Sequence, residues 1–284
     1  MSQDVSSLQE TSPHQSQSPQ PRSLPLQPSL PVIRFYGWTT KRDRQYFYLS
    51  NFYYSPFVDL SGRTWGTSEA YFQAQKYAYS TLSLTSEQLD ARKQFVESIR
   101  VNFTDCPALA FRLCRSHTRG GLGQMLAFLG INQPLQPYAS KSEKQQQQSE
   151  YVDVATRLRR QYRSTPATLG PISPIWCSQP LNPGGRIYAM IEAIVFKFYW
   201  SANLRQRLLD TGRAVLFETN PRDYFWAIGK LKTGQNVLGR LLMMLRDVIT
   251  RRPQPQASPA VWIERLVFAA KSAGFDRYGD SSAL

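Results

Sequence analysis

Residues 68–77 read Ser-Glu-Ala-Tyr-Phe-Gln-Ala-Gln-Lys-Tyr, and this stretch decides which fold we expect. Serine is a preferred N-cap residue, so Ser68 is predicted to cap a helix that runs through the stretch. On such a helix Glu69, Gln73 and Lys76 stand at positions i, i+4 and i+7 and therefore share one face. Long side chains on that face can converge on one small molecule.

Short strands and turns precede this helix. The pattern predicts strands at Tyr46–Leu49, Phe57–Leu60 and Thr64–Trp65, with a tight turn at Ser61–Arg63. Further helices are predicted near residues 86–100 and 106–115.

Two strongly periodic helices follow later in the chain. Apolar residues fall on one face of each: first Ile187, Met190, Ile191, Ile194, Val195 and Phe198, then Leu238, Leu241, Leu242, Leu245, Val248 and Ile249. Ser258-Pro259 begins a last amphipathic helix with Trp262, Leu266 and Ala270, which we expect to dock on the domain or on a partner. The elements expected along the chain are mostly helices, with a few short strands.

Composition divides the chain into segments. Residues 1–31 are rich in Ser, Pro and Gln and are expected to be a disordered tail. Residues 32–250 form the predicted domain, with an insertion at about 117–184, and residues 251–284 form a linker and the short C-terminal helix. A basic helix around Tyr151–Arg163 in the insertion can touch phosphates or be a solvated polar face.

Overall charge favours phosphate-bearing partners. Lys and Arg total 34 against 20 acidic residues, a formal charge of +14, although a solvated basic surface gives the same count. No apolar run is long enough for a membrane span and no signal peptide begins the chain, so we expect an intracellular protein, cytosolic or nuclear. The 2 histidines and 3 cysteines lack metal-site or triad spacing, and we expect no metal and no cofactor.

The shared face of residues 69–76 suits cleavage of an N-glycosidic bond. Such cleavage needs a group that protonates the departing base and a carboxylate that activates water or stabilises oxocarbenium character, and Glu69 fits either role. The Lys76 amine can instead attack the anomeric carbon and form a Schiff base with the opened sugar. The same spacing is also typical of an exposed Glu-Lys pair.

A second candidate region is residues 223–236. Gly234 and Asn236 stand in a loop that opens the last core helix, where free backbone N–H groups can bind phosphate. A turn with an N-cap explains the same residues.

At these stretches the sequence resembles the YbiA-like, or NADAR, family of N-glycosidases. The resemblance covers residues 34–115 and 186–249, and its main matches are Leu49 to Phe52, Trp65, Thr67 to Glu69, Tyr71 to Lys76, Met190, Lys197, Thr211, Glu218, Asp223, Trp226, Gly234, Asn236 and Leu238. It implies a YbiA-like α+β fold and a hydrolase acting on ADP-ribose or ribose-phosphate substrates. Family members remove ADP-ribose from guanine in nucleic acid or hydrolyse ribosylaminopyrimidine phosphates of riboflavin synthesis.

By position, the resemblance implies a set of site residues. Glu69 and Asp223 become the acid/base carboxylates and Lys76 the Schiff-base amine. The implied substrate-binding residues are Asn51, Phe52, Trp65, Gln73, Trp226, Gly234 and Asn236, with Phe52 and Trp226 as walls and the amides as positioning groups.

The sequence departs from the family pattern at two places. Asn182 stands where the family usually has Trp, and Trp176 can replace it only if the intervening loop doubles back. Ala227 replaces a common Gly. Both changes bear on pocket shape, so guanine-linked ADP-ribose, riboflavin intermediates and a non-catalytic ADP-ribose-binding module remain alternative functions, with the +14 charge favouring the first.

Overall fold

The computed structural model describes residues 30–36, 41–79, 82–102, 107, 110, 111, 114, 169–251 and 257–279. The chain divides into Met1–Leu30 and Pro31–Leu284, and the elements below belong to the second unit. Most of the predicted tail, the basic helix at Tyr151–Arg163 and most of the insertion lie outside the described residues.

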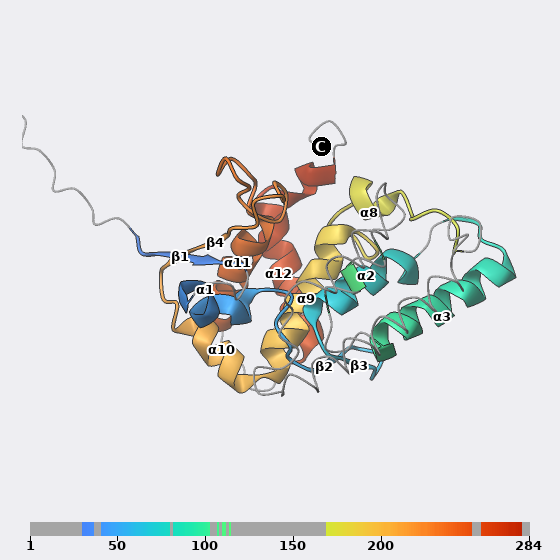
Figure 1. The fold of residues 1–284 in the computed structure, drawn as a ribbon, viewed down its shortest axis with the longest axis horizontal. Coiled ribbons are helices and arrows are strands. Elements are labelled where there is room, and N and C mark those ends of the chain that lie inside the picture. Colours follow the sequence, from blue (N-terminus) through green and yellow to red (C-terminus); the bar gives the residue numbers. More distant parts are fainter. Residues whose placement is uncertain are drawn as a thin grey trace, which may run out of the picture. The chain divides into compact units, whose positions relative to one another are not determined.

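The domain is mostly helical with four short strands among the described residues, which confirms the predicted α+β class (Figure 1). In chain order the elements are β1 (Val32–Phe35), α1 (Lys41–Tyr46), the 3₁₀ turn η1 (Phe47–Leu49), β2 (Phe57–Val58), β3 (Thr64–Trp65), α2 (Ser68–Ala78), α3 (Ser86–Asn102), α8 (Ile175–Ser178), α9 (Arg186–Trp200), α10 (Ala202–Leu209), β4 (Val215–Glu218), α11 (Val237–Arg251), α12 (Pro259–Ser272) and η2 (Phe275–Gly279). None of these helices is long and apolar enough to cross a membrane.

The strands form two pairs. β1 lies parallel to β4, with Val32 opposite Val215 and Phe35 opposite Glu218. β2 and β3 are antiparallel, as the predicted hairpin requires, and Gly62 takes a φ of 80° in the turn between them. A side chain with Cβ rarely adopts that conformation, so glycine suits this turn.

One predicted strand is wrong. Tyr46–Leu49 forms the end of α1 and the turn η1 instead of a strand. Tyr48 and Leu49 are adjacent in sequence and both buried, an arrangement that the alternating faces of a half-buried strand do not give. The Tyr48 hydroxyl also donates to the carbonyl of Arg207 at 2.7 Å, which fixes the turn against α10.

Helix α2 begins as predicted, but its N-cap is Thr67 and not Ser68. Thr67 has extended backbone angles, and its hydroxyl oxygen accepts the N–H of Ala70. Ser68 is the first helical residue, and its hydroxyl donates to the carbonyl of Ala193 on α9. The cap therefore leaves Ser68 free to join the two helices.

Helices α9 and α11 form the predicted apolar core. Residues 189–198 of α9 are all buried, and α2, α11 and α12 all pack against this helix (Figure 1). The predicted C-terminal helix is confirmed as α12, and it docks on the domain: Trp262 is buried with its ring 5.3 Å from that of Tyr199.

Strand β4 is tied to the start of α11 through one side chain. The Asn236 amide donates to the carbonyl of Leu216 at 2.8 Å and accepts the N–H of Glu218 at 2.9 Å. The backbone of Gly239 lies so close that an added Cβ would stand 2.3 Å from the Leu216 oxygen. This close approach fixes where β4 ends.

Replacing Gly239 with Ala should therefore destabilise the domain. The added methyl forces β4 away from α11, and we expect the free energy of unfolding to fall by about 1–3 kcal/mol, as in other overpacked sites. Urea unfolding measures the change. The control, Asp247→Ala on the exposed face of α11, should cost less than about 0.5 kcal/mol; equal stability of Gly239→Ala and the parent would contradict the close approach.

Candidate active site

Three polar side chains on α2 form one hydrogen-bonded line. The Gln73 amide donates to Glu69 Oε1 at 2.6 Å, and Lys76 Nζ donates to Gln73 Oε1 at 2.5 Å. Glu69 and Gln73 are buried, with 5% and 2% of their surface exposed, while Lys76 is partly buried. The predicted shared face is thus an interior face, and the exposed Glu-Lys alternative does not describe it.

Burial changes the acidity of Glu69. Desolvation raises the pKa of this carboxyl to about 7, against the lowering effects of the Gln73 hydrogen bond and the Lys76 charge. The charge of Asp223 adds to the increase. A carboxyl with this pKa exchanges a proton readily near neutral pH, as a general acid or base must.

Asp223 belongs to the loop between β4 and α11. Its Oδ1 accepts the N–H groups of Phe225 and Trp226 at 2.9 and 2.7 Å, a turn that holds the loop in shape. Trp226 then lies edge-on to Phe72 of α2, with ring centroids 5.4 Å apart. The loop therefore places the Asp223 carboxylate and the Trp226 ring near the side of α2 that carries Glu69.

Arg186 is the cation on the Asp223 side of this region. Its guanidinium stacks over the Phe225 ring at 3.8 Å and donates to the carbonyl of Tyr278 at 2.9 Å. Burial lowers the pKa of Arg186, while the charges of Cys177 and Asp223 raise it. The arginine thus connects the start of α9 with the Asp223 loop and with η2.

Glu218 is a third carboxyl near the other two, and it was given no role by sequence reasoning. Burial raises its pKa to about 8, with further increases from the charges of Asp223 and Glu69. Its Oε2 is enclosed and has no hydrogen-bond partner among the described residues. The sequence signals were its match to the family pattern and its place as the acidic residue that ends the apolar run Val215–Phe217. Within the described residues, no group of three or more His, Cys, Asp or Glu side chains is arranged so that it could hold a metal ion.

Asn51 and Phe52 lie beside the start of α2. The Asn51 carbonyl accepts the N–H of Glu69 at 3.1 Å, and its amide contacts the Met190 sulfur at 3.1 Å. The side-chain oxygen of Asn51, Oδ1, is buried and has no hydrogen-bond partner among the described residues. Buried unsatisfied acceptors are rare in folded proteins, and this one belongs to the residue whose backbone carbonyl bonds to Glu69. The Phe52 ring stands edge-on to Phe111 at 6.1 Å.

Two predicted substrate-binding residues have structural partners instead. Trp65 is fully buried, donates its indole N–H to Asp59 at 2.9 Å and packs on Tyr71, which points away from Glu69 around α2. Asn236 uses both ends of its amide on the backbone of β4, as described above. Asn236 therefore positions Glu218 and does not present its amide to a ligand.

The predicted phosphate-binding loop at Gly234 is also occupied. The N–H groups of residues 234–238 donate to the carbonyls of Ile228, Tyr224, Ala227, Phe225 and Trp226, in that order, at 2.8–3.2 Å. Each donor that was expected to face phosphate is thus bonded to the Asp223 loop. The glycine is required because an added Cβ would stand 2.2 Å from the Ala227 oxygen.

The loop before α9 doubles back. This is the arrangement that Trp176 needs to take the place of the family tryptophan, since Asn182 stands at that position here. Turns at Gln179–Asn182 and Asn182–Gly185 reverse the chain, and the N–H of Tyr188 donates to the Pro180 carbonyl at 2.8 Å. Trp176 on α8 consequently packs on Phe72, with ring centroids 5.2 Å apart. Phe72 thus lies between two tryptophans.

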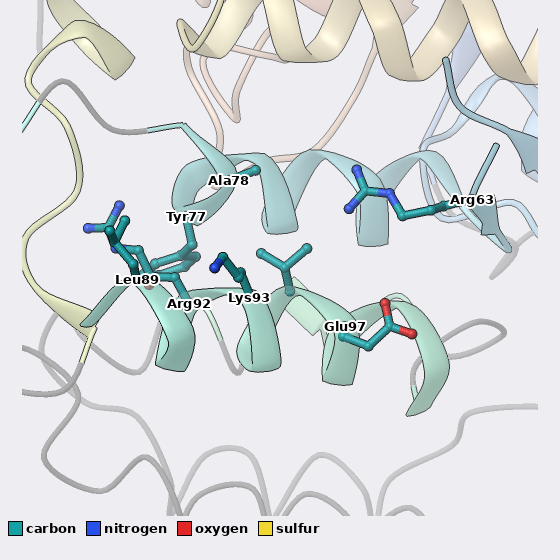
Figure 2. Close-up of a pocket in the computed structure, with 8 residues that line it drawn as sticks. Arg63, Tyr77, Ala78, Leu89, Arg92, Lys93 and Glu97 are labelled. Carbon is teal, nitrogen blue, oxygen red and sulfur yellow. The ribbon is translucent and has the colours of Figure 1, made fainter. Parts of the chain in front are cut away.

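A cavity of about 480 Å³ lies elsewhere, between α2 and α3. Figure 2 shows Arg63, Lys93 and Glu97 along it, and none of the predicted site residues lines it. Glu97 pairs with Arg100, and Lys93 pairs with Asp90 at 3.0 Å. The chemistry described above belongs to the other side of α2.

Comparison with known proteins identifies relatives of parts of this chain. Residues 184–250 match the model of the NADAR domain. The chain is 45% identical over 60 residues to N-glycosidase Npun_R5314 of Nostoc punctiforme, a match that covers 21% of this chain and 38% of that protein. It is 45% identical over 64 residues to the chloroplastic riboflavin biosynthesis protein PYRR of Zea mays, covering 22% of this chain and 10% of the relative.

Among solved structures, the NMR structure of the E. coli protein YbiA aligns with a TM-score of 0.47 and 24% identity, over 80% of this chain and 89% of that one. The match to the N-glycosidase spans well under half of that relative's length.

The fold and site define a class: an α+β domain in which buried carboxyls and a hydrogen-bonded lysine share one region. Within that class, residues 184–250 match the NADAR domain family that the sequence resembles.

The raised pKa of Glu69 predicts a pH-dependent stability. Because the folded pKa of about 7 exceeds the unfolded value of 4.5, the stabilising contribution is complete below pH 4.5 and is lost as pH rises through 7. The stability of the wild type relative to Glu69→Gln should fall by on the order of 3 kcal/mol across that window.

Urea unfolding at half-unit pH steps measures this difference. Glu264→Gln, at an exposed position on α12, is the matched control and should show a flat difference. A flat difference for Glu69→Gln as well would mean that Glu69 ionises normally in the folded protein.

Proposed function

We propose that this chain is a hydrolytic N-glycosidase that cleaves the bond between a base and a ribose phosphate or ADP-ribose. The line Glu69–Gln73–Lys76 carries the proposal, because it joins a carboxyl of pKa about 7 to an amine through one buried amide. The name of the Nostoc relative, an N-glycosidase, supports the same reaction class.

In the proposed reaction the Lys76 amine attacks the anomeric carbon. The bond from that carbon to the base nitrogen breaks, and its electron pair leaves with the base. The lysine adduct opens to an imine, which one water then hydrolyses, so the sugar gains a hydroxyl and the amine is released. Gln73 fixes the amine by accepting its hydrogen, and Glu69 in its ionised form accepts the proton of the attacking water.

Other residues of the region hold the substrate. Trp176, Phe72 and Trp226 form a row of aromatic rings on which a base or the ribose can pack. Asp223 keeps a carboxylate on the same side, where its charge stabilises oxocarbenium character at the sugar. Asn51 Oδ1, buried without a partner beside Glu69, accepts a sugar hydroxyl.

Guanine carrying ADP-ribose in nucleic acid is the substrate that we propose first. Such a substrate brings many phosphates, and the chain's formal charge of +14 attracts them at long range. The replacement of the usual family glycine by Ala227 and the packing of Trp176 on Phe72 distinguish this region from the family pattern.

A ribosylaminopyrimidine phosphate of riboflavin synthesis is the second candidate. The observation in its favour is the match to the riboflavin biosynthesis proteins PYRR of Zea mays and Arabidopsis thaliana, at 45% and 44% identity. Both substrates share the ribose phosphate and the N-glycosidic bond, so the catalytic residues serve either one.

Incubation with a guanine-ADP-ribosylated single-stranded oligonucleotide tests the proposal. The wild type should remove the ADP-ribose mass, whereas Glu69→Gln and Lys76→Arg should be slower by about 10²–10⁴-fold. Glu264→Gln on α12 is the matched control and should keep the wild-type rate.

The outcomes separate the alternatives. Turnover of the aminopyrimidine phosphate with no turnover of the oligonucleotide would support the second substrate. ADP-ribose binding without release of a base from either substrate would contradict the enzyme and indicate a binding module.

A further inference from the structure

Glu218 is fixed at the site by the fold itself. It is the last residue of β4, and its N–H donates to Asn236 Oδ1 at 2.9 Å. Its carbonyl accepts the N–H of Ile228 at 2.9 Å, which closes the Asp223 loop onto the strand. With both backbone groups held, the direction in which the side chain leaves the strand is set.

One oxygen of the carboxyl group at this position lacks the partner that an anion needs. Oε2 is enclosed, and no described residue donates a hydrogen bond to it. The residue as a whole keeps part of its surface exposed, so the carboxyl group is not sealed into the core. A buried carboxylate without donors is costly, so the neutral acid is the stable form.

The groups around Glu218 act in the same direction. Asp223 in the loop and Glu69 on α2 place negative charge near it, and burial is the largest effect, raising its pKa to about 8. Tyr36, which follows β1, is the neutral neighbour on the β1 side, and its pKa is raised by burial and by Glu218.

Positive groups act on each of these neighbours: Lys76 on Glu69, Arg222 on Tyr36, and Arg186 on Asp223. On the α11 side the strand meets Gly239 and the Met243 sulfur, which carry no charge. The two charged neighbours that raise the pKa of Glu218, Asp223 and Glu69, are both acidic.

We propose that Glu218 is the general acid of the site and protonates the base as it departs. This proposal rests on the N-glycosidase function proposed above. As the bond between the anomeric carbon and the base nitrogen breaks, the electron pair on nitrogen takes the carboxyl proton of Glu218. The water that later hydrolyses the lysine adduct leaves its hydroxyl on the sugar and gives its proton to Glu69. Glu69 then releases this proton to solvent, and Glu218 takes one proton back from solvent.

The three groups then have separate tasks. Lys76 is the nucleophile, Glu69 is the base toward water, and Glu218 is the acid toward the leaving group. Because the two carboxyls influence each other, their titrations are coupled and a rate profile reports the pair. Activity requires Glu69 ionised and Glu218 protonated, so kcat should pass through a maximum between about pH 7 and 8.

The test is the pH dependence of kcat and KM for Glu218→Gln on whichever substrate the wild type hydrolyses. We expect kcat to fall by about 10²-fold or more, as for loss of a general acid, with KM within about threefold of wild type. The decline of kcat on the alkaline side should also vanish, because Gln does not titrate. A kcat within threefold of wild type, or an unchanged alkaline decline, would overturn the proposal.

Glu192→Gln is the matched control. Glu192 is also a buried carboxyl whose pKa burial raises to about 7, but its partner is the hydroxyl of Tyr71, on the side of α2 away from Glu69. This variant should keep the alkaline decline of the wild type. A loss equal to that of Glu218→Gln would mean that removing any buried carboxyl has this effect, and would overturn the proposal.

A second measurement separates this proposal from the enzyme assignment. If the wild type releases no base from any substrate, the proposed function fails. The neutral state of Glu218 is still testable by unfolding: relative to Glu218→Gln, the wild type should lose stability between pH 4.5 and about 8, because the folded pKa exceeds the unfolded one. A flat difference would overturn the neutral acid in either case.

Discussion

Burial of polar side chains on α2 is the constraint on which the rest of the site depends. Nine of the eleven residues of this helix are buried, including Glu69 and Gln73. Each buried polar group must find a partner, and the spacing of α2 lets Gln73 satisfy Glu69 on one side while it accepts from Lys76 on the other. The same burial that shields these groups from water moves the pKa of Glu69 into the neutral range.

A second constraint brings distant segments to that helix. Asn236 joins the end of β4 to the start of α11, and the loop between them folds back so that residues 234–238 bond to its carbonyls. In this arrangement the Trp226 ring contacts that of Phe72, and the charge of Asp223 raises the pKa of Glu69. Gly234 and Asn236, which were expected to bind phosphate, thus hold the loop that carries Asp223 and the strand end that carries Glu218.

Sequence periodicity was sufficient for the long elements and for the face that Glu69, Gln73 and Lys76 share, because helical spacing is a local property. It failed where tertiary contacts decide. The turn at Phe47–Leu49 is held by contact with α10. Thr67 is the N-cap of α2, while the Ser68 hydroxyl bonds to α9. The pairing of β1 with β4 joins segments that are far apart in the chain. Glu218 was missed for the same reason, since its burial and its acidic neighbours exist only in the folded domain.

The most direct test of the central claim is to trap the lysine adduct during turnover. Sodium borohydride reduces an imine to a stable amine. Wild-type protein turning over substrate should therefore retain the mass of the ADP-ribose, or of the ribose phosphate with the second substrate, on the peptide that contains Lys76. Lys76→Arg should retain none. Base release by the wild type with no trapped mass, or with a trapped mass on another residue, would contradict the account in which the hydrogen-bonded line on α2 performs the chemistry.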